Sequence, residues 1–209
     1  MDLKPEELTE RGYVELDRLD HQQLPPFIRQ YLGRWNAYTV SYYIANLLAL
    51  AGVVWVFLKV APDTVPAVGD RFTRLSYGLA LAFLLVPLHE YLHVLAYRSQ
   101  GARQTSYGAN LRKLYFMAIA DRFVANEREF RIVALTPFVV ITALLVLSLP
   151  FLNPAWQLTI SGTLLTHTAM CSGDFGLLSF FAAHRKDGVV TFDDQPAGMT
   201  WFLGRKDSL

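Results

Sequence analysis

The sequence predicts an all-α membrane protein with four transmembrane helices and a β-hairpin-like segment between the second and the third. Composition is the first reason: 53% of the 209 residues are apolar and 18% are charged, against roughly 25% charged residues in a typical soluble domain. The second reason is length, because about 20 apolar residues rising 1.5 Å each cross a hydrocarbon layer of about 30 Å. Four stretches are long enough: residues 38–60, 75–97, 132–152 and 156–183.

The small net charge and the single cysteine exclude several other classes of protein. The formal net charge is +1, and Cys171 is the only cysteine. A nucleic-acid-binding domain with a basic surface and a disulfide-bonded scaffold are therefore excluded. The high apolar content also excludes a disordered chain. The lipid bilayer is thus an expected partner, whereas nucleic acid is not.

The polar ends of the chain are expected to flank a transmembrane domain of residues 38–183. Residues 1–37 contain no recognisable cleavable signal and are predicted to form a cytoplasmic N-terminal segment. Its last part, from Pro25 to Trp35, mixes arginine with aromatic residues, which suits an interfacial helix or a loop leading into the membrane. His21 lies outside the spans and is expected to be solvated. Residues 184–209 are predicted to form a cytoplasmic C-terminal tail.

Lysine and arginine counts orient the predicted helices. The connection between the second and third spans, residues 98–131, is rich in arginine, whereas the turn at Asn153 and Pro154 has no basic residue. Basic residues gather on the cytoplasmic side. We therefore predict a multi-pass protein of the cell membrane with both termini and this connection in the cytoplasm. Strand-like stretches broken by Gly101, Gly108 and Asn110 predict the hairpin within residues 101–123.

Ionisable side chains within two of the spans indicate a functional site, because such groups are costly at membrane depth. The second span contains His89, Glu90 and His93 in the pattern HExxH. Residues four apart lie on one helix face, so both imidazoles can reach one Zn²⁺. Glu90 is placed to act as a general base on a metal-activated water.

A catalytic zinc site needs a third protein ligand, and the fourth span offers candidates. Asp174 is predicted to lie within about 6 Å of the depth of His93 in the membrane. It could be a zinc ligand, a hydrogen-bond acceptor from a ligand histidine or a structural residue. His167 lies two turns away on the same stripe. It could be the third ligand, a donor to the tetrahedral oxyanion or a helix-to-helix hydrogen-bonding group. Cys171 is expected to be a small packing residue, although a thiolate would also bind zinc.

The chain resembles site-2 type intramembrane metalloproteases and, more closely, small bacterial membrane proteins grouped as zincin peptidases. The matching stretches are residues 87–97 (PLHEYLHVLAY), 115–123, 131–140, 167–181 and 191–194 (TFDD). In such families two histidines and a distal aspartate hold zinc. The resemblance therefore implies that His89, His93 and Asp174 are ligands and that Glu90 is the base.

These observations predict an intramembrane zinc metalloprotease that hydrolyses membrane-embedded or membrane-proximal peptides, with Glu90 and His167 as catalytic residues. The alternative is a non-catalytic zinc-binding protein with an interaction or regulatory role in the membrane. A small transporter is a third reading, which four spans favour only if the protein oligomerises. A membrane protein or peptide is the expected substrate. The protein could also form a homo-oligomer. The segment 103–120 is expected to hold an extended substrate by strand addition.

Overall fold

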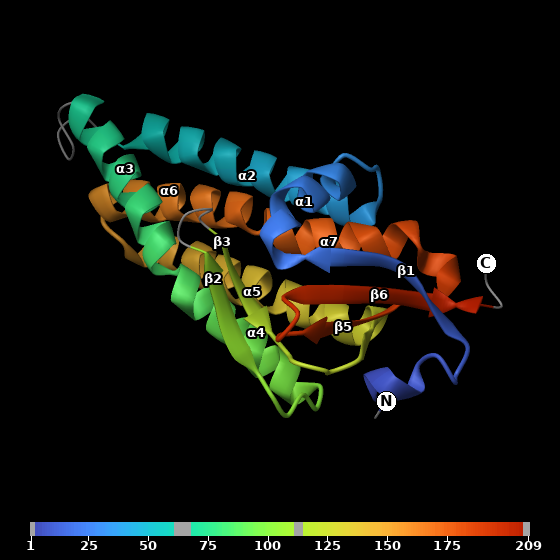
Figure 1. Ribbon diagram of the computed structural model, residues 1–209. Coiled ribbons are helices and arrows are strands. Elements are labelled where there is room, and N and C mark those ends of the chain that lie inside the picture. Colours follow the sequence, from blue (N-terminus) through green and yellow to red (C-terminus); the bar gives the residue numbers. More distant parts are fainter. Residues whose placement is uncertain (1–2, 61–67, 111–114, 207–209) are drawn as a thin grey trace. The chain divides into compact units, whose positions relative to one another are not determined.

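The computed structural model describes residues 3–60, 68–110 and 115–206, which are mostly helical (Figure 1). The chain divides into two compact units, each built from separate stretches of sequence. The first unit comprises Met1–Thr39, Glu90–Thr136 and Gly173–Leu209, and the second comprises Val40–His89 and Pro137–Ser172. Each unit is described by itself below.

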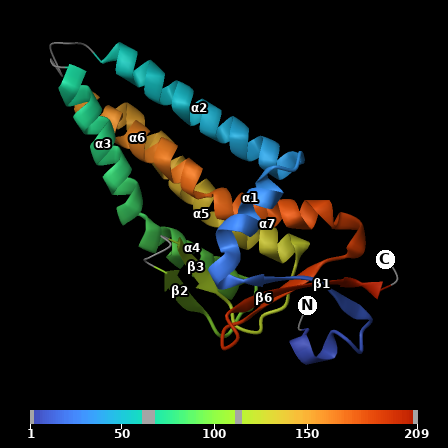
Figure 2. The same ribbon diagram turned by 45° about the horizontal axis from the view of Figure 1, so that its top comes forward.

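The first unit contains an antiparallel sheet that the sequence analysis did not predict. Its strands lie in the order β1-β6-β5-β4, with the bounds Tyr13–Asp20 (β1), Met199–Arg205 (β6), Val190–Asp194 (β5) and Ala125–Asn126 (β4). β1 and β6 come from opposite ends of the chain and lie side by side (Figures 1 and 2). The prediction of an all-α protein was therefore too narrow. The two end segments alternate buried and exposed residues over only a few positions, which is a weak signal in an otherwise apolar sequence.

Two helices of the first unit pack their aromatic side chains with the sheet. These helices are α1 (Leu24–Leu32) and α7 (Ser172–Ala183). Tyr31, Phe180, Phe181 and Phe202 form the centre of one buried cluster. The helices approach closely at Gly176, where an added Cβ would lie 2.9 Å from an Ile28 side-chain carbon. Much of the stretch from Pro25 to Trp35 is therefore helical, whereas its placement at a membrane interface stays a prediction.

Two further strands lie in the segment where the sequence predicted a hairpin. β2 (Ser106–Asn110) and β3 (Tyr115–Ile119) pair antiparallel, with Ser106 opposite Ile119 and Gly108 opposite Met117. They form a two-stranded sheet separate from the four-stranded one. The side of the membrane on which they lie stays a prediction.

The second unit is helical, and its closest packing joins α3 (Val68–Leu84) to α6 (Pro154–Met170) (Figure 2). Glycine makes this approach possible. A Cβ at Gly162 would lie 2.9 Å from the Leu75 carbonyl oxygen, and one at Gly78 would overlap the backbone of Thr159. Thr159 Oγ1 also donates to the Arg74 carbonyl oxygen at 3.1 Å. α6 begins at Asn153, whose side chain accepts from the Trp156 backbone N–H, as an N-cap does.

Among the described residues, three helices are long and apolar enough to cross a membrane. They are Ala37–Lys59 (α2), Gly69–Ser99, which comprises most of α3 and all of α4 (Val86–Ser99), and Glu127–Phe151, which contains α5 (Glu127–Ser148). The first matches the predicted span 38–60 closely. The other two begin about five residues before the predicted spans 75–97 and 132–152. α3 and α4 meet at Leu85, two residues before Pro87, where the proline ring removes a helical hydrogen bond.

The fourth predicted span, residues 156–183, is two helices instead of one. α6 ends at Met170 and α7 begins at Ser172, so neither reaches the length of a full span. The break falls at Cys171, whose backbone ψ of 6° departs from the helical value. Whether this stretch crosses the membrane therefore stays a prediction.

Candidate metal centre

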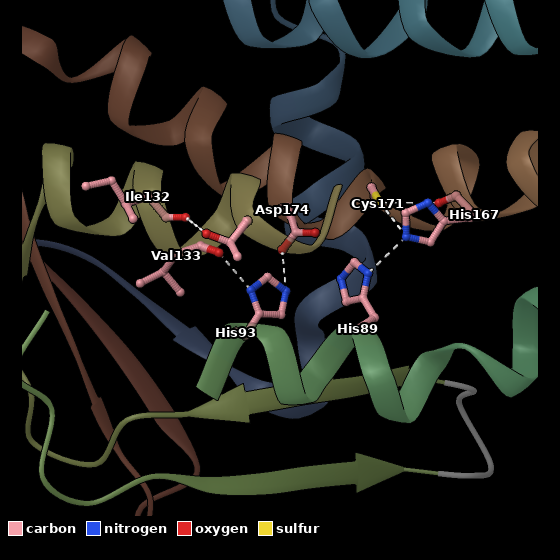
Figure 3. Close-up of polar contacts among 8 residues, drawn as sticks. His89, His93, Ile132, Val133, His167, Cys171 and Asp174 are labelled. Carbon is pink, nitrogen blue, oxygen red and sulfur yellow. Dashed lines mark hydrogen bonds and ion pairs between the residues drawn. The ribbon is translucent and has the colours of Figure 1, made fainter. Parts of the chain in front are cut away.

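The three residues of the HExxH motif lie on one helix, α4. Pro87 lies in the first turn of this helix, where proline is tolerated, and the His89 N–H donates to the Leu85 carbonyl oxygen at 2.9 Å. One ligand atom from each of His89, Glu90 and His93 lies within 4.8 Å of the other two. The two imidazoles project from the same face of the helix (Figure 3). The local spacing thus brings the two predicted ligands, His89 and His93, close to the predicted base, Glu90.

His93 is buried in the first unit with both ring nitrogens in contact (Figure 3). Nδ1 lies 3.0 Å from the Val133 carbonyl oxygen, and Nε2 lies 3.1 Å from Asp174 Oδ1. A carbonyl oxygen only accepts, so Nδ1 carries the hydrogen in that contact. Nε2 of a neutral ring is then an acceptor that faces a carboxylate. Two acceptors at this distance require a shared proton or a shared cation.

These donors fit a zinc ion. Two ligand atoms bound to one tetrahedral zinc at 2.0–2.1 Å lie about 3.3 Å apart, close to the separation of His93 Nε2 and Asp174 Oδ1. The Val133 carbonyl oxygen supplies the outer hydrogen bond that orients a ligand histidine. Asp174 lies in the first turn of α7, where the helix dipole favours a negative charge.

The second unit contains another group of potential ligands. His89 Nδ1 lies 3.4 Å from His167 Nε2, and this nitrogen lies 3.9 Å from Cys171 Sγ (Figure 3). One ligand atom from each of these three residues lies within 4.8 Å of the other two. His167 therefore contacts His89, and which of its three proposed functions it has stays a prediction. Cys171 belongs to this group as well, and its spacing of four residues from His167 was the signal for that contact.

Two further ionisable residues, Glu90 and His21, are buried. Glu90 is buried, with a relative exposure of 9%, although it is an ionisable residue. His21, expected to be solvated, is also buried, and its Nε2 lies 3.0 Å from Thr200 Oγ1. The reason is the pairing of β1 with β6, which brings Asp20, next to His21, opposite Met199.

An HExxH helix beside a partly buried aspartate, in a chain whose described residues include three helices able to span a membrane, is an arrangement that suits a metallopeptidase. Comparison with protein families agrees at the level of family. The chain belongs to the family described as "Putative zincin peptidase", whose model matches residues 82–188, just over half of the chain. The matched region contains His89, Glu90, His93, His167 and Asp174. No curated protein and no solved structure matches the chain.

Proposed function

We propose that this protein is an intramembrane zinc metallopeptidase in which His89, His93 and Asp174 hold Zn²⁺ and Glu90 is the general base. The observation that carries the proposal is the contact of His93 Nε2 with Asp174 Oδ1 at 3.1 Å, one helical turn from His89. The family supports metallopeptidase activity in general. Peptide-bond hydrolysis inside the membrane is the further step proposed here.

The roles of the side chains follow from their chemistry. When bound, zinc supplies a Lewis acid that acidifies water and polarises the scissile carbonyl. Glu90 accepts a proton from the attacking water and delivers it to the leaving amine, because its carboxylate sits one residue after the first ligand on the same helix. His167, which contacts His89, donates a hydrogen bond to the oxyanion of the tetrahedral intermediate. Val133 keeps the ring of His93 in the required tautomer.

A second ligand set has its own support. His89, His167 and Cys171 would form a thiolate-containing site, and such a site would suit a structural or regulatory zinc. Glu90 has no function in that arrangement. The second candidate is therefore a non-catalytic zinc-binding membrane protein.

The zinc content of the detergent-purified protein, measured by mass spectrometry, shows which of the two ligand sets binds the metal. Our proposal predicts about one zinc per chain in the wild type, lost in His93→Ala and Asp174→Ala and retained in Cys171→Ala. The second set predicts the reverse, with loss in Cys171→Ala and retention in Asp174→Ala. His89→Ala loses zinc in either case and serves as the positive control. Absence of zinc from the wild type after reconstitution would contradict both.

Activity is tested by comparing the wild type with Glu90→Gln, which keeps the size of the side chain but removes its basic group. New protein N-termini in the membranes of producing cells, identified by mass spectrometry, should appear with the wild type only. Loss of a general base typically lowers rates by about 10²–10⁴-fold. Glu90→Gln should keep its zinc, which distinguishes a lost base from a lost site. Equal cleavage by both proteins would remove Glu90 from the mechanism.

The proposed membrane topology has four crossings. β1, β4, β5 and β6 belong to one sheet and must lie on one side of the membrane. The chain leaves β1, passes through α2, α3 and α4, and returns to β4, so it crosses an even number of times. After β4 it passes through α5 and must return to β5. The stretch containing α6 and α7 then provides the fourth crossing, and the basic residues of the sequence favour a cytoplasmic sheet.

The proposed substrate is a membrane protein segment held in extended form against β2 or β3. Each strand of the two-stranded sheet has one edge without a strand partner among the described residues. An extended peptide can add to such an edge through backbone hydrogen bonds. Tyr107→Pro, in β2, should reduce cleavage without loss of zinc, whereas Gln104→Pro, in the loop before the strand, serves as the comparison for a general effect of proline. Unchanged cleavage in Tyr107→Pro and in a matching Phe116→Pro variant would argue against strand addition.

A further inference from the structure

A cavity of about 580 Å³ in the first unit lies apart from the HExxH helix. Its walls come from the beginning of α5, the residues that follow α7, the strands β5 and β6, and the N-terminal segment. Buried apolar residues line part of it, among them Leu3, Val124 and Phe181. A volume of this size is typical of small-molecule sites.

The other lining residues make the cavity strongly basic. Five of them are cationic: Arg128, Arg131, Arg185, Lys186 and Arg205. All five are exposed, so the charges surround the apolar residues. Only two lining residues, Glu127 and Glu129, are acidic, and the formal charge of the lining is therefore +3 with His184 neutral.

The two carboxylates already have local functions. Glu129 Oε2 accepts from the Asn126 backbone N–H at 2.9 Å, while Asn126 Oδ1 accepts from the backbone N–H groups of Arg128 and Glu129. This reciprocal arrangement is a capping box for α5. Glu127 lies 4.0 Å from the Arg185 guanidinium, a weak and largely exposed pair. Within the described part of the chain, Arg128, Arg131 and Lys186 take part in no ion pair.

These cations lie near the ends of helices, as basic residues that bind phospholipid phosphates do. Arg128 and Arg131 lie in the first turns of a helix long and apolar enough to cross a membrane, and Lys186 follows the end of α7 by three residues. Basic side chains at the ends of membrane helices commonly bind anionic head groups. The apolar lining residues suit the glycerol and upper acyl carbons of such a molecule.

We infer that this cavity binds a phosphate-bearing anion through Arg131 and Lys186, with an anionic phospholipid as the favoured source. A phosphate oxygen accepts charge-assisted hydrogen bonds from guanidinium and ammonium groups. A soluble phosphate compound shares this chemistry, and the experiment distinguishes the two sources. The inference does not depend on peptidase activity or on zinc.

The test uses the full chain in a zwitterionic detergent and measures binding of short-chain phosphatidylglycerol, short-chain phosphatidylcholine and inorganic phosphate by calorimetry. Phosphatidylglycerol should bind, and Arg131→Gln and Lys186→Gln should each weaken it about tenfold, as loss of one charge-assisted bond does. Arg103→Gln removes the same charge from an exposed position outside the cavity and should leave the affinity unchanged. Arg131→Lys should keep most of the affinity for phosphatidylglycerol. This result would show that the positive charge in a folded cavity is what binding requires.

Each outcome has a definite meaning. Tighter binding of phosphatidylglycerol than of inorganic phosphate, sensitive to the two cavity variants, supports the lipid as the source. Equal affinity for the two, with the same sensitivity, supports the phosphate site with a soluble ligand. No binding of either anion overturns the inference. Binding that is unchanged in Arg131→Gln and Lys186→Gln, or equal for phosphatidylcholine, also overturns it.

Discussion

At the scale of single residues, the contact between His93 and Asp174 decides how the candidate site is interpreted. Val133 fixes the hydrogen on Nδ1, so the atom that faces the carboxylate has a lone pair to share. A metal ion satisfies both acceptors at once. A purely structural hydrogen bond would instead need a proton between His93 Nε2 and Asp174 Oδ1. Replacement of the carboxylate by an amide separates these two functions.

Asp174→Asn should lower the zinc content at least tenfold while the protein stays folded. The asparagine amide can donate a hydrogen bond to His93 Nε2 and so preserve the packing, but it lacks the negative charge that a zinc ligand provides. Zinc per chain by mass spectrometry and melting temperature in detergent are the two readouts. Asp70→Asn, at the start of α3, is the charge-matched control. Full zinc content in Asp174→Asn would show that Asp174 is structural.

His21 should make the stability of the first unit depend on pH. Thr200 Oγ1 donates to Asp193 Oδ1 at 2.7 Å, so His21 Nε2, 3.0 Å away, must donate to Thr200. Burial lowers the pKa of His21 below its usual 6.5, although the carboxylates of Asp193 and Asp20 oppose this shift. Burial raises the pKa of Asp193, and this shift acts in the opposite direction, because the folded chain then binds a proton at Asp193 at a higher pH than the unfolded chain does. Below about pH 6.5 the unfolded chain therefore binds a proton at His21 that the folded chain does not.

The contribution of His21 to the free energy of unfolding should consequently decrease as the pH is lowered from 7.5 to 5.5. The slope contributed by one histidine is at most about 1.4 kcal/mol per pH unit. His21→Gln keeps an N–H donor for Thr200 but does not titrate, so its melting temperature should decrease less over this range. Thermal melting in detergent, followed by tryptophan fluorescence, measures the difference. Parallel curves for the two proteins would show that His21 does not control acid stability.

The residues of the candidate site could be predicted from sequence to differing degrees. His89, Glu90 and His93 are fixed relative to one another by a single helical turn, so local spacing was sufficient. Asp174 was placed near His93 from its estimated depth in the membrane, and the two do meet. The burial of His21 depends on strands at opposite ends of the chain, and no local pattern contains that information.

At the scale of helices, glycine sets the distance between α3 and α6. Gly162→Ala would place a Cβ 2.9 Å from the Leu75 carbonyl oxygen, a backbone atom that cannot rotate away. We expect a loss of about 1–3 kcal/mol of stability, as is typical of overpacking. Gly52→Ala, in the middle of α2, has nothing within 4 Å and should be neutral or stabilising by up to about 1 kcal/mol. Equal melting temperatures for the two variants would contradict this account of the packing.

The helices themselves were predictable because length and apolar content are local properties. Their breaks were harder to locate. The interruption at Leu85 has a cause in the sequence, Pro87, whereas the break at Cys171 follows no proline and depends on packing. Gly162 and Gly176 allow close approach of neighbouring helices, whereas Gly173 has open space around its Cβ position.

At the scale of the whole molecule, the four-stranded sheet constrains the path of the chain through the membrane. Its strands come from three separated regions of sequence. Strand pairing of this kind is non-local, so the sequence predicted polar ends without predicting that they pair. The sheet adds a requirement that hydropathy alone does not impose, namely that residues 13–20, 125–126 and 190–205 share one side.

This requirement can be tested with single cysteines and a membrane-impermeant maleimide on intact cells. Phe151, between α5 and α6, has a relative exposure of 88%, and Ala197, in the turn between β5 and β6, is also exposed. With four crossings and a cytoplasmic sheet, Phe151→Cys should be labelled from outside, and Ala197→Cys only after permeabilisation. The wild type is the control, because Cys171 is buried. Labelling of both variants from outside, or of neither, would place residues 151 and 197 on one side, and the stretch from α6 to α7 would then not cross the membrane.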